Sequence, residues 1–294
     1  MPISSVLSEY TFANLGPLTT TWTAPASCAT STDHVRIGLT KLPGRAYYDA
    51  SCQVREYSCV PTGESADPAL ATNLNPTNLF QEAYFSPGLY CPSGWTTAGL
   101  ASRNGTASVT WSGLFSPTVA IPTTVDGAIF NNPGNVLMQL LDASETAMVC
   151  CPSSMTAGYY IGCYSTLPDY KFTTGCERVI PTADLSAVDR TFWYDGQTIV
   201  ASVYTLVGTV PLDQTTTVTF NGTGTSSLVA YSVLPPVTLI HKAADYEATA
   251  TAAAMATSNA AVRQSSATGS WDVMGIVFSV TVLSMVLGAA ISLV

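Results

Sequence analysis

The cysteines carry the clearest chemistry in this sequence. All eight lie within the first 180 residues: Cys28, Cys52, Cys59, Cys91, Cys150, Cys151, Cys163 and Cys176. A structural zinc site uses paired C-x-x-C spacings or histidine partners, but the sequence has no C-x-x-C and only two histidines. The cysteines are therefore expected to form disulfides in an oxidising compartment. Many connectivities remain open, although the adjacent Cys150 and Cys151 should bond to different partners, because a bridge between neighbours strains the peptide that joins them.

The other reactive residue types form no recognisable catalytic motif. The sequence lacks G-x-S-x-G, H-E-x-x-H, the P-loop and G-x-G-x-x-G, so no catalytic, cofactor-binding or metal-binding residue is predicted. A Ser-His-Asp triad needs a histidine base. His34, beside Asp33, is the histidine expected within the body, whereas His241 borders the segment that follows it. His34 is interpreted as a surface residue.

Two further arrangements leave a carbohydrate-active alternative open. The 19 acidic residues could include the carboxylate pair of a glycoside hydrolase, since only their separation in space matters, but the sequence does not single out two of them. Aromatic residues could also form a sugar-binding platform, although they more often fill a β-sheet core. The candidates for such a platform are Trp22, Trp95, Trp111, Trp193 and Tyr194.

Two sequons agree with an extracellular compartment. Asn104 and Asn221 each begin an Asn-Gly-Thr triplet, which is an acceptor for N-glycosylation. Each Asn-Gly also lies between runs of β character, where it favours a tight exposed turn. The alternative is that both triplets are hairpin turns that carry no sugar.

Short apolar runs interrupted by Pro and Gly indicate a chain made mainly of β-strands. Residues 106–111 alternate as a half-buried strand does, and residues 198–210 are a further strand candidate. Residues 215–220 and 227–233 are expected to pair as a hairpin, before Pro235 and Pro236 interrupt the chain. Residues 135–141, NVLMQLL, fit a short helix or a buried strand equally well.

The fold class predicted from these runs is mainly β, a disulfide-stapled antiparallel ectodomain resembling a β-sandwich. An Ala/Ser/Thr-rich stalk and one apolar C-terminal helix are expected to follow it. The predicted boundaries are 1–27 for a Thr/Pro-rich segment, 28–241 for the cysteine-containing body with a sub-boundary near 180, 242–271 for the stalk and 272–294 for the membrane segment.

The amino-acid composition indicates which kinds of partner the protein could bind. Charged residues make up 10% of the sequence and the net charge is −9, against roughly 25% charged residues in an ordinary soluble domain. The ten Lys and Arg residues are scattered singly, so no basic surface for nucleic acid is expected. Polarity comes from Ser, Thr, Asn and Gly, which suits an extracellular β-rich glycoprotein.

The C-terminal segment predicts membrane attachment. Residues 273–294 contain no charge, and a helix of this length would span roughly 33 Å, about the core of a bilayer. Two interpretations compete: a retained transmembrane helix with Trp271 at the interface, or the signal for a glycosylphosphatidylinositol (GPI) anchor. The anchor signal is favoured because no basic residue follows the segment and small residues precede it. The anchor-site candidates are Ser265, Ser266, Gly269 and Ser270.

The first 25 residues show neither the basic start nor the apolar run of a secretory signal peptide. An upstream signal, an unconventional signal, or a tail-anchored protein with its body in the cytosol would each explain this. The third explanation would leave the thiols reduced and the sequons unused. The body is therefore expected to be extracellular.

A short motif occurs twice in the sequence. Residues 91–98 read CPSGWTTA, and residues 151–157, after Cys150, read CPSSMTA. With residues 16–21 and 26–28, these segments resemble a group of uncharacterised cell-surface proteins of filamentous ascomycete fungi that carry a C-C-P-S-G-aromatic motif. The resemblance implies a β-rich ectodomain, a Ser/Thr-rich stretch and a C-terminal membrane segment, and it implies no catalytic residue. This sequence departs from the motif at Ser154 and Met155.

These observations together predict a fungal-type glycoprotein of the plasma membrane or cell surface, with a structural or adhesive role and no catalysis. The C-terminal segment would hold it at the membrane, and cell-wall polysaccharide is a candidate partner. A surface carbohydrate-binding protein or glycoside hydrolase is one alternative. A tail-anchored intracellular membrane protein is another.

Overall fold

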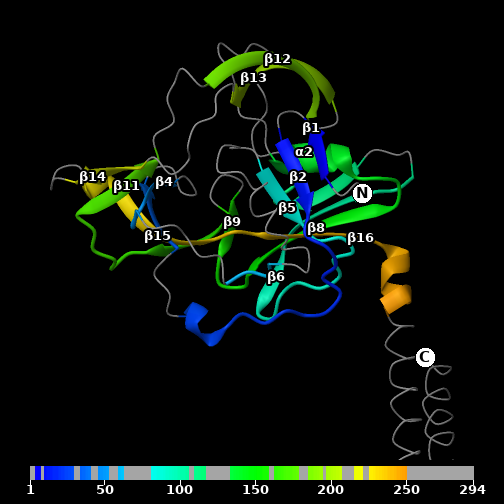
Figure 1. Ribbon diagram of the computed structural model, residues 1–294, viewed down its shortest axis with the longest axis horizontal. Helices are drawn as coiled ribbons and strands as arrows, with labels where there is room; N and C mark the ends of the chain where they lie inside the picture. Colours follow the sequence, from blue (N-terminus) through cyan, green and yellow to red (C-terminus); the bar gives the residue numbers. More distant parts are fainter. Residues whose placement is uncertain are drawn as a thin grey trace, which may run out of the picture. The chain divides into compact units, whose positions relative to one another are not determined.

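The strands in the described part of this protein fall into four sheets (Figure 1). The chain divides into two compact units, residues 1–246 and residues 247–294, and all four sheets belong to the first. The computed structural model describes residues 4–7, 10–29, 34–40, 46–52, 59–62, 81–105, 109–116, 133–158, 162–178, 185–194, 197–206, 215–220 and 225–249.

A four-stranded antiparallel sheet forms the centre of the core. Its strand order is β16 (Val237–Lys242), β8 (Glu145–Pro152), β6 (Trp95–Arg103) and β7 (Val109–Gly113). Successive side chains on a strand point to opposite faces. Ala147 and Val149 of β8 accordingly pack in the largest apolar cluster, while Met148 and Cys150 pack in a second one. Burial on both faces explains the nearly continuous apolar run of β8.

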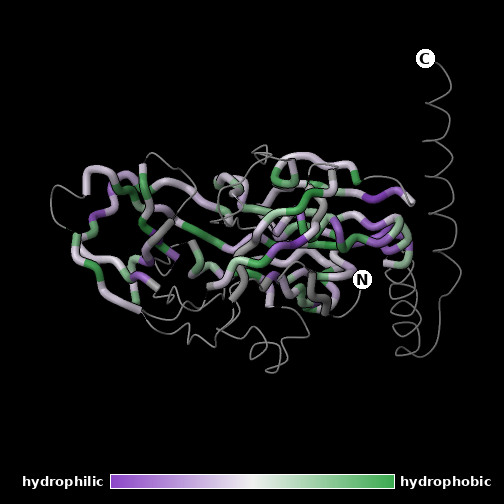
Figure 2. Tube along the Cα trace, turned by 90° about the horizontal axis from the view of Figure 1, so that it is seen from above, coloured by the Kyte–Doolittle hydropathy of each residue, from purple (hydrophilic) through white to green (hydrophobic). Residues whose placement is uncertain are grey.

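The largest cluster lies between this sheet, the helix α2 (Pro133–Leu140) and a three-stranded sheet. The order of the latter is β1 (Ser4–Leu7), β2 (Tyr10–Asn14) and β5 (Gln81–Tyr84), and β2 pairs with β5 in parallel. Figure 2 shows hydrophobic and hydrophilic residues interleaved along the chain of the first unit. Each fully buried large apolar side chain in the largest cluster contributes about 1.5–3 kcal/mol to the stability of the fold.

A seven-stranded sheet joins distant parts of the chain through antiparallel pairs. Its order is β14 (Thr215–Thr219), β11 (Thr174–Arg178), β4 (Ala46–Asp49), β3 (Val35–Leu39), β15 (Leu228–Leu234), β10 (Gly162–Leu167) and β9 (Thr156–Gly158). The hairpin of β12 (Leu185–Tyr194) and β13 (Gln197–Leu206) forms the fourth sheet. Two short 3-10 helices, η1 (Ala26–Ala29) and η3 (Thr225–Ser227), also occur among the described residues.

The chain passes twice between the four-stranded and seven-stranded sheets. One passage runs from β15 through Pro235 and Pro236 into β16, almost as one continuous line in Figure 1. Proline has no N–H to donate to a ladder, which explains why the pairing changes there. The other passage runs from β8 through β9 into β10. The two sheets are therefore joined by a pair of neighbouring crossings.

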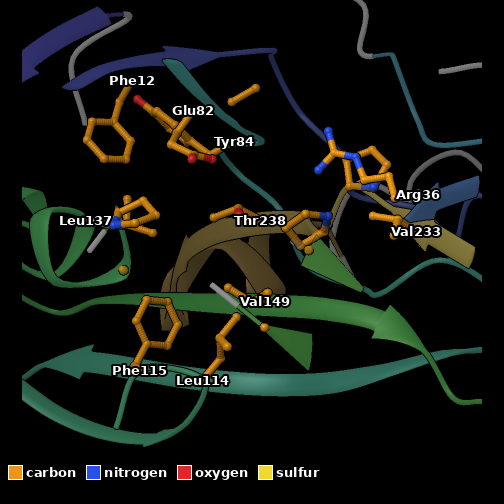
Figure 3. A pocket seen from close by; sticks show the side chains of 17 residues that line it. Phe12, Arg36, Glu82, Tyr84, Leu114, Phe115, Leu137, Val149, Val233 and Thr238 are labelled. Carbon is orange, nitrogen blue, oxygen red and sulfur yellow. The ribbon is translucent and has the colours of Figure 1, made fainter. Parts of the chain in front are cut away.

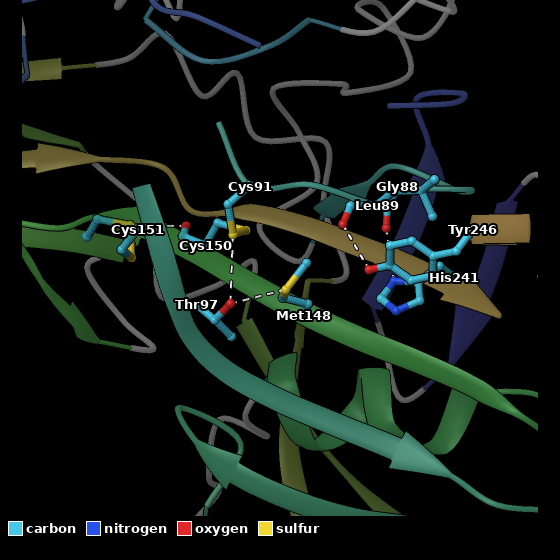
Figure 4. Close-up of a disulfide and its surroundings, with 10 residues drawn as sticks. Gly88, Leu89, Cys91, Thr97, Met148, Cys150, Cys151, His241 and Tyr246 are labelled. Carbon is cyan, nitrogen blue, oxygen red and sulfur yellow. Dashed lines mark hydrogen bonds between the residues drawn. A yellow bond between two sulfur atoms is a disulfide. The ribbon is translucent and has the colours of Figure 1, made fainter. Parts of the chain in front are cut away.

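Disulfides reinforce this junction. Cys150 bonds to Cys91, and Cys151 bonds to Cys163. The adjacent cysteines have different partners, as predicted, because alternation along β8 turns their side chains to opposite faces. Figure 4 shows the first of these bonds beside Thr97 and Met148.

The remaining four cysteines are also paired, Cys28 with Cys59 and Cys52 with Cys176. The prediction of disulfide bonding is therefore confirmed, and so is a mainly β chain with antiparallel sheets. Disulfides in this number are typical of a secreted or extracellular domain.

Several local predictions can be compared with these elements. The predicted break at Pro235 and Pro236 is confirmed, and residues 135–141 fall largely in the helix α2. Asn104 lies in the turn that joins the antiparallel strands β6 and β7, whereas residues 106–108 lie outside the described residues.

The predicted hairpin of residues 215–220 and 227–233 is wrong. β14 pairs with β11, and β15 pairs with β3 and β10, so three strands separate the two in the sheet. The backbone N–H of Thr40 donates to the carbonyl of Ser227, 2.9 Å away. This contact ties the start of β15 to a segment far away in the sequence.

Within the described residues, no helix combines the length and apolar character needed to cross a bilayer. The predicted membrane segment 272–294 and the anchor-site candidates lie outside the described residues. The predicted stalk is described up to residue 249, and residues 243–249 are helical. Asp245 accepts a hydrogen bond from the backbone N–H of Lys242 at 2.6 Å, as in a helix-capping box.

Candidate functional site

A cavity of about 230 Å³ lies among the main elements of the first unit (Figure 3). Side chains and backbone come to it from β2, β5, α2, β8 and β16, and from the two crossings between the large sheets. The lining residues are mainly apolar, with Arg36, Glu82, Tyr84 and Thr238 as the polar ones. They are Phe12, Arg36, Glu82, Ala83, Tyr84, Leu114, Phe115, Pro133, Gly134, Leu137, Val149, Gly158, Gly162, Val233, Pro235, Pro236 and Thr238.

The parallel pairing of β2 with β5 positions the cavity's carboxylate. Glu82 lies directly beside Phe12 in the register of the two strands. Because side chains alternate along a strand, Glu82 and Tyr84 share one face of β5. Phe12 and Tyr84 are both almost completely buried, so Glu82 is held between large aromatic side chains.

Burial raises the pKa of Glu82 to about 7. Among the described residues, none donates a hydrogen bond to its carboxylate or forms an ion pair with it. The surrounding side chains are poor replacements for water, so the charged form is disfavoured. A carboxyl group in this position changes protonation near neutral pH.

Arg36 is the cationic residue of the lining, and it lies on a different side of the cavity from Glu82 in Figure 3. Its Nε lies 3.2 Å from Oδ1 of Asp49, and the two residues form a half-exposed ion pair between β3 and β4. Arg36 therefore contributes to the cavity wall while its charge is directed to Asp49.

Tyr84 contributes a second polar group from β5. Burial, with further contributions from Glu145 and Asp142, raises the pKa of Tyr84 to about 12, so its hydroxyl stays protonated at neutral pH. Glu145 is itself buried and accepts a hydrogen bond from the backbone N–H of Asp142 at 2.8 Å. That bond closes the turn before β8, which gives Glu145 a structural role.

Backbone approaches the cavity closely at one crossing. Gly162 has φ +88°, and a Cβ there would lie 2.6 Å from the carbonyl oxygen of Leu234. Only glycine fits both this conformation and this contact without strain. The tight approach brings β10 against Pro236, and both Gly162 and Pro236 line the cavity.

A second cluster surrounds His241 (Figure 4). The ring Nδ1 of His241 lies 2.9 Å from the carbonyl oxygen of Gly88, and since a carbonyl can only accept, Nδ1 carries the proton. The hydroxyl of Tyr246 donates to the carbonyl of Leu89 at 3.0 Å. The Tyr246 ring makes edge contacts with His241 and with Tyr90. The first helical turn after β16 is thereby fixed to the loop that follows β5.

The structure corrects the placement of the histidines. His241, which was expected to border the stalk, is buried on β16, opposite Thr146 of β8. The strand β16 continues to residue 242. The change to a polar, Ala/Ser/Thr-rich composition at that position gave no sign that the preceding residue would be buried in a sheet. His34 is half-buried, and Asp33 lies outside the described residues.

The aromatic platform candidates separate into different environments. Trp95 packs against the cluster that contains Cys150, and Trp111 packs against the largest cluster. Trp22 lies in the loop before η1, where its carbonyl accepts from the backbone N–H of Ser93. The side chains of Trp193 and Tyr194 are outside the described residues.

Of the two predicted glycosylation sites, one lies within the described residues and the other does not. Asn104 is exposed in its turn, which leaves it open to modification, whereas Asn221 lies outside the described residues. No group of three or more metal-ligating side chains occurs in the described stretches. Glu82, the carboxylate of the cavity, was not singled out among the 19 acidic residues. Its signal was local: it stands inside an apolar β-like run, QEAYF at 81–85.

Comparison with models of protein families, with curated proteins and with solved structures found no match for this chain.

Proposed function

We propose that the β body is the extracellular part of a cell-surface glycoprotein with a structural or adhesive role. The observation that carries the proposal is the pairing of all eight cysteines in four disulfides. Such bonds form and persist in oxidising compartments. The exposed Asn104 provides an acceptor for N-glycosylation there.

The proposal includes a sandwich-like ectodomain, the Ala/Ser/Thr-rich stalk, and attachment to the plasma membrane through residues 272–294. A GPI signal cleaved near Ser265–Ser270 is favoured over a retained transmembrane helix. The resemblance of the CPSG-type motifs to surface proteins of filamentous ascomycetes supports this organisation. Cell-wall polysaccharide is the proposed partner, with neither catalysis nor nucleic-acid binding.

Treatment of intact cells with phosphatidylinositol-specific phospholipase, followed by mass mapping of both termini, tests the anchor. Release of a protein that ends near Ser265–Ser270 is the expected result. A protein retained on the membrane that still ends at Val294 would establish a transmembrane span instead. Non-reducing mass spectrometry of alkylated material tests the compartment, and eight free thiols would refute the extracellular assignment.

A surface carbohydrate-binding protein is the second candidate, and one observation favours it. Tyr90 and Tyr246 are 42% and 37% exposed and lie edge to face with ring centroids 5.9 Å apart. Exposed tyrosines offer an apolar face and a polar hydroxyl, a combination suited to binding at a wet interface. Titration with soluble cell-wall glycans, comparing the native chain with Tyr90→Ala, tests this role. Equal binding by both proteins would exclude this tyrosine pair as the binding surface.

A further inference from the structure

We propose that the cavity between β2, β5, α2 and the crossings of the two large sheets is a binding site for a small organic amine. The ammonium group would pair with the Glu82 carboxylate, and the hydrocarbon part would fill the apolar remainder of the cavity. The inference does not depend on the cell-surface role proposed above.

The volume sets the size of the ligand. An apolar cavity of roughly 150 Å³ accommodates benzene, so the space of about 230 Å³ found here suits a molecule of about nine non-hydrogen atoms. A phenylalkyl or short branched alkyl group fits this limit, whereas an oligosaccharide is too large.

The lining sets the polarity of the ligand. Phe12, Phe115, Leu137 and Val149 present apolar surface (Figure 3). Ligand sites of this kind combine an apolar wall with a few converging polar groups that fix orientation. Here Glu82 supplies the anionic group, and Thr238 supplies a hydroxyl.

Electrostatics favour a cationic group at Glu82. Glu82 is half-buried in the cavity wall. A carboxylate removed from water is costly unless it is paired, and no described residue pairs with this one. Burial raises its pKa to about 7. An ammonium ligand would restore the missing partner and return the carboxyl to its charged form.

Few other charged or titratable groups line the cavity. They are Arg36 from β3, which is paired with Asp49, and Tyr84 from β5, whose pKa is raised to about 12. Neither changes charge near neutral pH. Glu82 is therefore the lining residue expected to control the pH dependence of binding.

Calorimetric titration of the oxidised full chain with phenethylamine and with its neutral analogue 2-phenylethanol tests the proposal. We expect the amine to bind at least tenfold more tightly at about pH 8 than at about pH 5, because the carboxyl must be ionised to pair with it. The neutral alcohol should show no such dependence. Absence of amine binding at both pH values would overturn the proposal.

Two matched variants locate the site. Glu82→Gln keeps the shape and removes the charge, so we expect at least a tenfold loss of phenethylamine affinity and less than a twofold change for 2-phenylethanol. Glu177→Gln removes an exposed carboxylate on β11, away from the cavity lining, and should bind both ligands as the native chain does. If Glu82→Gln bound the amine normally, the pairing with Glu82 would be refuted.

Discussion

Replacing Glu82 by glutamine should change how the stability of the body depends on pH. The native carboxyl titrates at about 7, against 4.5 for the ordinary group. Between these values the folded chain binds a proton that the unfolded chain has released, so the free energy of unfolding falls as pH rises. A glutamine side chain does not titrate, so the contribution of position 82 to this fall in the free energy of unfolding should be absent in Glu82→Gln.

The magnitude follows from the two pKa values. Each tenfold change in proton affinity corresponds to about 1.4 kcal/mol, so the penalty from Glu82 reaches about 3 kcal/mol once the pH exceeds 7. Below about pH 4 both states are protonated and the penalty vanishes. Relative to the native chain, Glu82→Gln should therefore gain about 3 kcal/mol between about pH 4 and about pH 8.

Urea unfolding at several pH values, with the disulfides intact and tryptophan fluorescence as the signal, measures this difference. Subtracting the native curve from the variant curve removes the titration of the other carboxyl groups. Glu177→Gln, at an exposed position on β11 and outside the cavity lining, is the matched control with which the Glu82→Gln difference is compared. A difference for Glu82→Gln that does not change with pH would refute the assignment of Glu82 to an unpaired, half-buried position in the cavity wall.

Three further predictions concern the stability of the body, each measured by urea unfolding. Gly113→Ala places a Cβ against the backbone carbonyl oxygen of Ala98 at φ +59°, so it should lose clearly more stability than Gly105→Ala, which has the same φ and open space around it. Replacing Cys52 and Cys176 together by serine removes the disulfide that closes a 124-residue loop, and it should lower the free energy of unfolding by about 5 kcal/mol. Tyr246→Phe removes one hydrogen bond to the body and should cost about 1 kcal/mol.

Each of these predictions has an outcome that contradicts its reasoning. Equal losses at Gly113 and Gly105 would show that crowding at Gly113 does not matter. A loss below about 2 kcal/mol for the double cysteine variant would mean that the unfolded chain is little constrained by that bond. If Tyr246→Phe left the free energy of unfolding unchanged, the hydrogen bond from Tyr246 to Leu89 would not contribute to the stability of the body.

Features set by neighbouring residues were predictable from the sequence. The break at Pro235 and Pro236 and the separate partners of Cys150 and Cys151 depend on backbone preferences within a few residues. Each follows from a local rule about prolines or strand alternation.

Features set by distant pairing were not predictable in the same way. The local turn signal after β14 favoured a hairpin with β15, yet the ladders place β11, β4 and β3 between them. Cys52 on one side and Cys176 on the other link two of these strand regions over a long sequence separation. Such pairings depend on the whole sheet, which no single segment encodes.

The cavity shows why a single acidic residue could not be selected from the sequence. The position of Glu82 in an apolar run fits an edge strand with an exposed face as well as a buried one. Its partial burial arises because β2 lies beside β5 in parallel, and because α2 and the crossing strands contribute to the same cavity. These contacts join segments from both ends of the body.

The same assembly explains why the carboxyl is informative about function. Glutamine at position 82 would fill the same volume without the ionisation penalty, so folding alone gives no reason for a carboxyl there. The penalty is removed when a cation occupies the cavity, and the free energy released then adds to ligand affinity. A destabilising group directed into an apolar cavity is thus better explained by binding than by stability. This argument requires that an amine ligand raise the stability of the native chain more at about pH 8 than at about pH 5, and that the gain disappear in Glu82→Gln.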